Sequence, residues 1–139
     1  MTVRSRGLSE HSESLRRSFP ADAGAPGVAR RAVKDFLAAR GADPGALSDV
    51  LLAVSEVVTN CVVHAYRGRP AGKVDLEARH QGDRLLLSVA DEGGGMAPRH
   101  DSPGLGLGLP LVGRVARRVD ISAQAGGGTL VSMWFDLDR

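Results

Sequence analysis

The feature that most constrains the fold is a pair of apolar segments joined by residues that favour a tight turn. Residues 73–80 and 84–90 have the composition of strands, and Gln81-Gly82-Asp83 separates them. Glycine and aspartate suit a short hairpin turn, so we expect the two strands to pair antiparallel. The economical way to bury one face of such a sheet is to cover it with helices.

Two segments before the hairpin have helical periodicity. Residues 28–40 end at Gly41 and place one apolar set on a single face: Val28, Ala32, Phe36 and Ala39. Residues 44–66 follow Asp43, the expected N-cap, and carry a longer buried stripe: Leu47, Leu51, Val54, Val58, Cys61 and Ala65. We expect the lone cysteine, Cys61, to be an inert core thiol.

The remaining elements complete a layered pattern. We expect a short edge strand at residues 15–19, a third helix at 109–118, and two final strands at 119–125 and 129–137. The glycine-rich residues 91–108 form a loop. This order predicts an α/β (α+β) fold: a two-layer sandwich in which a mixed, mostly antiparallel sheet is covered on one face by helices.

Length and composition limit the classes of protein. The chain has 139 residues, enough for one packed core, so we expect a leader without fixed structure at residues 1–12 and one domain at 13–139. We find no apolar run approaching the roughly 20 residues of a membrane span and no signal-peptide core, which predicts a cytoplasmic protein without membrane association. Dispersed arginines and a net charge of +2 argue against direct nucleic-acid binding.

A polar pair stands on the second predicted helix. Glu56 and Asn60 are four residues apart, on the side opposite the apolar stripe, and His64 extends them into a polar ridge. A carboxamide oxygen is a suitable Mg²⁺ ligand, and a carboxylate can accept the proton of a hydroxyl or water. Taken alone, such a pair is more typical of a solvated helix surface.

A second candidate follows the strand at residues 84–90. Asp91 can accept a hydrogen bond from an exocyclic amine such as that of adenine, and Gly93 and Gly95 allow backbone to approach a base and sugar. Thr129, at the start of the last strand, can bond to the base or to Asp91 through water. A glycine-rich turn and a purely structural threonine account for these residues equally well.

A third candidate precedes the third predicted helix. Gly104, Gly106 and Gly108 expose backbone N–H groups next to a helix N-terminus, an arrangement suited to a triphosphate. No Gly-Lys-Ser/Thr follows, so this is not a P-loop. The preceding loop and the antiparallel pattern downstream exclude a Rossmann fingerprint.

These segments resemble a known set when they are taken in order. EVVTNCVVHAY, DEGGGM, GLGLGLPLV and GGGT occur in the order of the N box, the two glycine boxes and the terminal threonine motif of the histidine-kinase-like ATPase superfamily, which has the Bergerat ATP-binding fold. The TN-x-x-x-HAY ending resembles bacterial anti-sigma factor serine kinases of the RsbW and SpoIIAB type. The resemblance covers about residues 13–139.

The resemblance implies a role for each matched residue. Glu56 would be the catalytic base, and Asn60 would hold Mg²⁺ against the phosphates of ATP. Asp91 would recognise the adenine amine, and Thr129 would support that contact. The other nucleotide-binding positions are glycines, of which two shape the adenine pocket and three close on the phosphates: Gly93, Gly95, Gly104, Gly106 and Gly108.

The resemblance also implies partners. The protein would be an ATP-binding anti-sigma factor that phosphorylates a serine or threonine on a small STAS-like antagonist, binds a sigma factor, regulates transcription by partner switching, and forms a homodimer. The alternative is a nucleotide-dependent binding module of the same fold that transfers phosphate slowly or never. The ATPase half of a histidine kinase fits less well, because about 25 residues before the first helix cannot hold a dimerisation hairpin.

Overall fold

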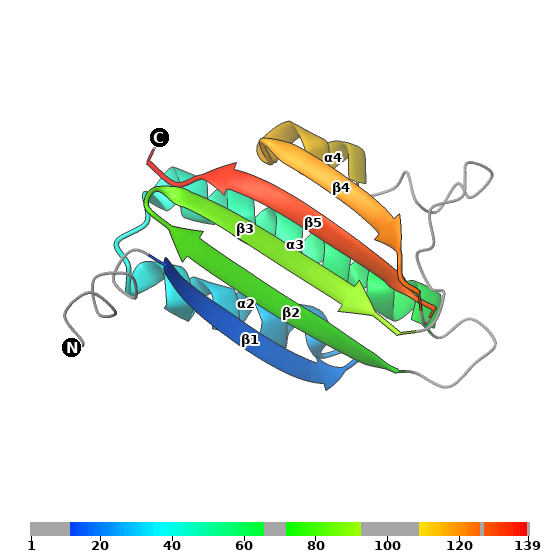
Figure 1. The fold of residues 1–139 in the computed structure, drawn as a ribbon. Coiled ribbons are helices and arrows are strands. Elements are labelled where there is room, and N and C mark those ends of the chain that lie inside the picture. The colour runs from blue at the N-terminus through cyan, green and yellow to red at the C-terminus, as the bar shows by residue number, and fades with distance from the viewer. Residues whose placement is uncertain (1–11, 66–71, 93–108, 126, 139) are drawn as a thin grey trace, which may run out of the picture.

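In the described part of the chain, five strands form one sheet, and three helices lie on one of its faces (Figure 1). The computed structural model describes residues 12–65, 72–92, 109–125 and 127–138. The strands are β1 (Ser12–Pro20), β2 (Lys73–Gln81), β3 (Arg84–Asp91), β4 (Arg118–Ala123) and β5 (Thr129–Asp136), and the helices are α2 (Ala25–Ala38), α3 (Pro44–Ala65) and α4 (Leu109–Val115). The sheet order is β1-β2-β3-β5-β4. The predicted two-layer sandwich is confirmed, and its described strand pairs are all antiparallel rather than mixed.

The β2–β3 hairpin has the expected tight turn, but with two residues rather than the predicted three, because Gln81 belongs to β2. Gln81 pairs with Arg84, and Gly82 between them has a φ of 63°. Along β3, Leu85, Leu87 and Val89 are buried under the helices, and the alternate residues lie on the opposite face. This alternation gives the sheet one covered face and one open face.

Helix α3 lies across the covered face and contacts β3 and β5. Asp43 is its N-cap as predicted, because its Oδ2 accepts hydrogen bonds from the backbone N–H groups of Gly45 and Ala46, at 2.9 and 3.1 Å. The sequence-based statement that no segment approaches a membrane span was wrong. Residues 44–64 are long and apolar enough by length and composition, and the fold uses their apolar side chains in its core.

Helix α2 begins at Ala25, three residues before the predicted start, and its buried face overlaps the predicted one only in part: Phe36 is buried as predicted. Its core residues are Ala25, Ala29, Val33, Phe36 and Leu37. Val28, expected in the core, is 43% exposed. The helix carries apolar residues on two adjacent faces, and the larger set, with Val33 and Leu37, is the buried one because it covers more apolar surface.

Several element ends differ from the prediction by one to three residues, and β1 and α4 are among those with the largest shifts. Strand β1 begins at Ser12 rather than Leu15 and is the expected edge strand. Helix α4 ends at Val115 rather than Arg118, because the backbone N–H of Arg117 already donates to the carbonyl of Trp134 on β5, at 2.7 Å. Backbone pairing with a neighbouring strand therefore ends the helix early.

Candidate functional site

Three elements bring polar side chains to one end of the covered face. The C-terminal end of β3, the start of β5 and the last turns of α3 lie at the same end of the sandwich (Figure 1). Ala90 pairs with Leu130, and Asp91 and Thr129 occupy the next positions on these strands. Both belong to the inward-facing set, and their exposed fractions are 3% and 0%. The two predicted site residues therefore lie together beneath the helix layer.

Helix α3 contributes the next two residues. Asn60 is 8% exposed, and Cys61 is fully buried with its Sγ 3.9 Å from Oδ2 of Asp91. Burial in the core and, next, the charge of the Asp91 carboxylate raise the pKa of the Cys61 thiol. The thiol therefore stays protonated and donates a weak hydrogen bond to Asp91. Cys61 is a core residue as predicted, and its contact with Asp91 was missed.

Two buried polar atoms of this cluster have no hydrogen-bond partner within the described part of the chain. They are Nδ2 of Asn60 and Oγ1 of Thr129. Leaving a buried polar group unsatisfied costs about 1–3 kcal/mol. A third such atom, Nε of Arg40, lies elsewhere and is within ion-pair distance of the Glu13 carboxylate. Asn60 and Thr129 are thus suited to contact a polar ligand.

The β4–β5 turn holds the backbone of this site. Gly128 has a φ of 94°, and a Cβ at this position would overlap the carbonyl oxygen of Asp91. The same carbonyl accepts a hydrogen bond of 3.1 Å from Nε2 of Gln124. Gln124 and Gly128 were missed as contributors to the site. The run of glycines before Thr129 was the available signal for Gly128, and nothing in the sequence indicated Gln124.

The predicted polar ridge is only partly as expected. Glu56 is half-buried on α3, one turn before Asn60, so the four-residue spacing holds. The placement of this pair and His64 opposite the apolar stripe was wrong, because Asn60 and His64 are buried. Helix α3 is covered over a wide arc, and this arc includes the side on which Asn60 stands beside Val57 and Cys61.

The five predicted nucleotide-binding glycines lie in a part of the chain that the structure does not describe. They are Gly93, Gly95, Gly104, Gly106 and Gly108, and their roles stay predictions. The described residues include no group of three or more His, Cys, Asp or Glu side chains that could hold a metal ion. The carboxamide of Asn60 offers an oxygen of the hard type that Mg²⁺ prefers, and phosphates supply such oxygens as well.

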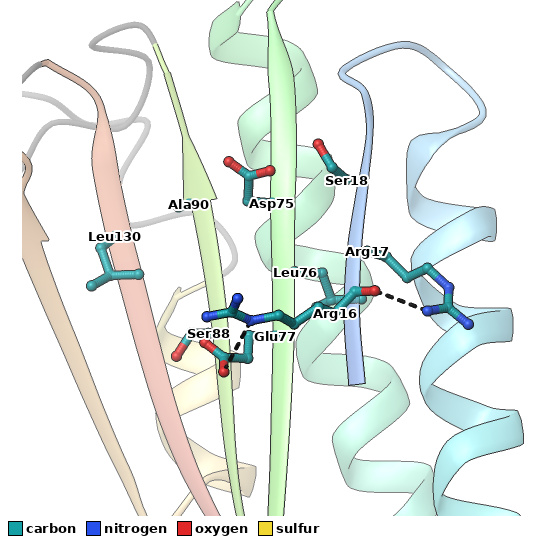
Figure 2. Close-up of a pocket in the computed structure, with 9 residues that line it drawn as sticks. All are labelled: Arg16, Arg17, Ser18, Asp75, Leu76, Glu77, Ser88, Ala90 and Leu130. Carbon is teal, nitrogen blue, oxygen red and sulfur yellow. Dashed lines mark hydrogen bonds and ion pairs between the residues drawn. The ribbon is translucent and has the colours of Figure 1, made fainter. Parts of the chain in front are cut away.

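A cavity of about 490 Å³ lies on the open face of the sheet, opposite the face that carries this cluster. Figure 2 shows that its lining comes from β1, β2, β3 and β5, with the helices behind the strands. The lining residues are Arg16, Arg17, Ser18, Asp75, Leu76, Glu77, Ser88, Ala90 and Leu130. None of the predicted site residues belongs to this set.

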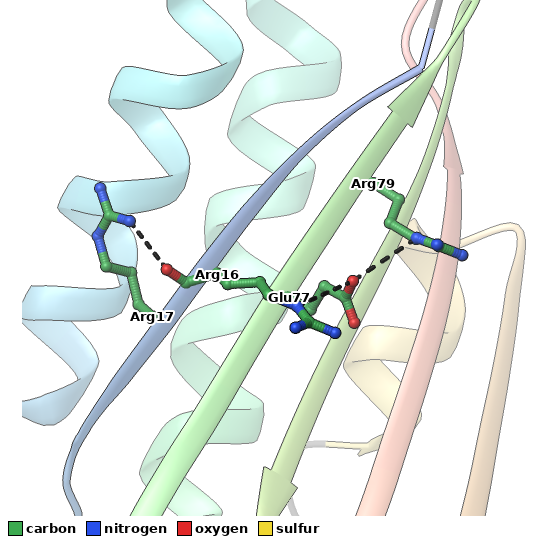
Figure 3. A network of polar contacts seen from close by, with 4 residues as sticks. All are labelled: Arg16, Arg17, Glu77 and Arg79. Carbon is green, nitrogen blue, oxygen red and sulfur yellow. Dashed lines mark hydrogen bonds and ion pairs between the residues drawn. The ribbon is translucent and has the colours of Figure 1, made fainter. Parts of the chain in front are cut away.

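Charged side chains beside this cavity pair with one another. Figure 3 shows the carboxylate of Glu77 between two arginines, with Oε2 of Glu77 3.5 Å from Nε of Arg16 and 3.6 Å from Nε of Arg79. Both arginine side chains are largely exposed, so each pair contributes about 0–1 kcal/mol. Among the described lining atoms, none is a buried polar atom without a partner. The cluster on the covered face is therefore the better candidate for the functional site.

Comparisons with known proteins agree with this geometry. A family model described as a histidine kinase-like ATPase domain matches residues 19–135. An anti-sigma F factor from Clostridium beijerinckii is 32% identical over 114 residues, which cover 74% of this chain and 80% of that protein. The serine-protein kinase RsbW of Bacillus licheniformis is 31% identical over 128 residues, 81% of this chain and 79% of the relative.

A solved structure is similar as well. The crystal structure of the RsbU and RsbW domains of Rv1364c from Mycobacterium tuberculosis matches with a TM-score of 0.72 and 26% identity. The match covers 91% of this chain and 33% of that longer one. This chain thus spans about a third of that solved chain.

Proposed function

The chain belongs to the family of histidine kinase-like ATPase domains, and from this premise we propose that it is an ATP-binding anti-sigma factor that acts as a serine/threonine kinase on a small antagonist protein. The observation that carries the proposal is the cluster on the covered face. Asn60, Asp91 and Thr129 come from three separate elements and are buried together, and two of them have a polar atom without a partner in the described protein.

Each of these residues suits one part of ATP. The Asp91 carboxylate accepts a hydrogen bond from the adenine amine, and the Thr129 hydroxyl supports this end of the nucleotide. The carboxamide of Asn60 would hold Mg²⁺, which neutralises charge on the phosphates when bound. The five glycines outside the described residues would complete the pocket.

Glu56 is the proposed general base. It stands one helical turn before Asn60 and is half-buried, so its carboxylate can meet a hydroxyl that approaches from outside. As the serine oxygen of the antagonist bonds to the γ-phosphorus, the bond from that phosphorus to the bridging oxygen of ADP breaks. The serine proton passes to Glu56. The products are ADP and a phosphoserine on the antagonist.

The proposed partners follow from the same family. They are a small STAS-like antagonist, which is the substrate, and a sigma factor, which the protein would sequester when the antagonist is phosphorylated. We also propose a homodimer in the cytoplasm. The relatives named anti-sigma F factor and serine-protein kinase RsbW support the proposed sigma-factor and kinase roles.

Transfer of labelled phosphate tests the proposal. The wild-type protein, γ-labelled ATP, Mg²⁺ and the antagonist should give a labelled antagonist. Glu56→Gln should lower the transfer rate by about 10²–10⁴, the usual contribution of a general base, and leave the Kd for ADP within about twofold. Glu77→Gln on the open face is the matched control and should transfer at the wild-type rate.

Two outcomes would contradict parts of the proposal. If the wild-type protein binds ADP but labels no antagonist, the protein is a nucleotide-dependent binding module and the kinase assignment is wrong. If neither ATP nor ADP binds, the assignment of the site itself is wrong.

A further inference from the structure

Gln124 stands at the start of the β4–β5 turn with both of its backbone groups held. Its N–H donates to the carbonyl of Gly128, and its carbonyl accepts from the N–H of Gly127, each at 3.0 Å. Gly127 and Gly128 have φ angles of 96° and 94°, which the backbone of glycine adopts readily. The turn therefore presents the Gln124 side chain from a defined backbone.

That side chain reaches a residue 33 positions earlier in the chain. Nε2 of Gln124 donates to the carbonyl oxygen of Asp91 at 3.1 Å. The pairing of β3 with β5 ends one residue before, at Ala90 and Leu130. Gln124 thus adds a side-chain donor at the point where this strand pairing stops.

Asp91 is consequently held at two places by groups outside β3. The thiol of Cys61 contacts Oδ2 of its carboxylate, and Gln124 holds its peptide carbonyl. The direction of a carboxylate depends on the torsion angles of its own backbone, so freeing the peptide allows the side chain to sample other directions. A ligand that needs one direction then binds more weakly, because it must order the group itself.

We propose that Gln124 is a positioning residue for nucleotide recognition, holding the Asp91 peptide so that its carboxylate favours adenine over bases without the exocyclic amine. This inference rests on the proposed function, because it concerns the same site. It predicts a change in base selectivity. A role confined to stabilising the turn would change the melting temperature and weaken all nucleotides equally.

Isothermal titration of ADP and inosine diphosphate separates these roles, because the inosine base has a carbonyl oxygen in place of the adenine amine. The wild-type protein should prefer ADP. Gln124→Met keeps the length of the side chain without its donor. It should weaken ADP binding about fivefold, the loss expected for one hydrogen bond. Inosine diphosphate binding should weaken less than twofold. Gln124→Lys retains a donor and should restore the preference for ADP to within about twofold.

The matched control is Gln81→Met. Gln81 is the last residue of β2, at the opposite end of this strand from the residue that pairs with Asp91, so the change should leave both affinities unchanged. The inference is overturned if Gln124→Met keeps the wild-type preference for ADP, or if Gln124→Lys loses the preference as fully as Gln124→Met. If the wild-type protein binds neither nucleotide, the proposed function fails and this inference with it. If the wild-type protein binds ADP and Gln124→Met has unchanged selectivity, the proposed function stands and only the role of Gln124 is overturned.

Discussion

The two faces of the sheet treat their polar residues in opposite ways. On the open face, charged side chains pair with one another in water, as Glu77 does with Arg16 and Arg79. On the covered face, Asp91 and Thr129 are buried at one end of the sheet, and the Thr129 hydroxyl has no partner within the described residues. The same strands thus carry exposed ion pairs on one face and a polar cluster that is costly to bury on the other.

The size of that cost indicates which face is the better candidate for a ligand site. Exposed ion pairs contribute about 0–1 kcal/mol each and are found on most protein surfaces. A buried polar atom without a partner costs about 1–3 kcal/mol of folding free energy. A protein that retains such an atom at this cost is expected to use it to bind a ligand. The cavity on the open face is therefore a weaker indication of function than the buried polar atoms of the covered face.

Among the substitutions that compare the two faces, Gly128→Ala is expected to have the largest effect on stability and ADP binding. The new Cβ would overlap the Asp91 carbonyl oxygen, and a φ of 94° is strained for alanine. We expect a loss of about 2–4 kcal/mol in the free energy of unfolding, together with weaker ADP binding. Urea unfolding and calorimetric titration measure the two quantities.

Gly82→Ala is the control for this change. Gly82 has a φ of 63°, and nothing lies within 4 Å of the position that a Cβ would take there. It should cost only about 1 kcal/mol and leave ADP binding unchanged. Equal losses of stability in the two variants would show that the Asp91 contact is unimportant.

Asp91→Asn should have the next largest effect, on binding rather than folding. It removes the charge that strengthens the hydrogen bond to the adenine amine, and such charge-assisted bonds contribute about 1.5–3 kcal/mol. The Kd for ADP should rise about 10- to 100-fold in calorimetric titration. Asp75→Asn, which lines the open-face cavity, should bind ADP like the wild type, and a loss of affinity there instead would move the site to the open face.

Thr129→Val sharpens the comparison, because it separates ligand binding from folding. The hydroxyl has no partner within the described protein, so its removal should leave the free energy of unfolding unchanged or raise it by up to about 1 kcal/mol. ADP binding should weaken about three- to tenfold. Destabilisation with unchanged ADP binding would assign the hydroxyl a structural role. Ser132→Ala, on the open side of β5, is the matched control.

The smallest effect is expected from Glu77→Gln. It removes the carboxylate between Arg16 and Arg79 (Figure 3), and the free energy of unfolding should change by no more than about 0.5 kcal/mol. This change should shrink further as salt is added, because exposed charges are screened. A loss of more than about 2 kcal/mol would contradict the view that the open face is energetically neutral.

Features set by short-range chemistry could be predicted from the sequence. The Gly82-Asp83 turn, the Asp43 cap and the antiparallel pairing of β2 with β3 depend on residues close in the chain, and all are confirmed. The buried face of α2 was predicted only in part. Phe36 is buried as expected and Val28 is exposed, because two adjacent faces of the helix are apolar and only packing against the other elements selects one.

The site residues also divide into those that the sequence could predict and those that depend on long-range packing. Asp91 and Thr129 could be found because each stands at a strand end beside a glycine-rich segment. The burial of Asn60 depends on how α3 lies on the sheet, and the contact of Gln124 with Asp91 joins residues 33 positions apart. Long-range contacts of this kind leave no periodicity or motif in a single sequence.

The most direct test of the central claim is a nuclear magnetic resonance titration with ADP and Mg²⁺ that observes both faces at once. If the nucleotide binds at the covered face, the resonances of the Asn60 side-chain amide and the Thr129 methyl group should shift. The indole N–H of Trp134, which belongs to the open side of β5 and has the Arg118 guanidinium over its ring, should stay in place. A shift of the Trp134 indole with Asn60 and Thr129 unchanged would contradict the account and place the nucleotide on the open face.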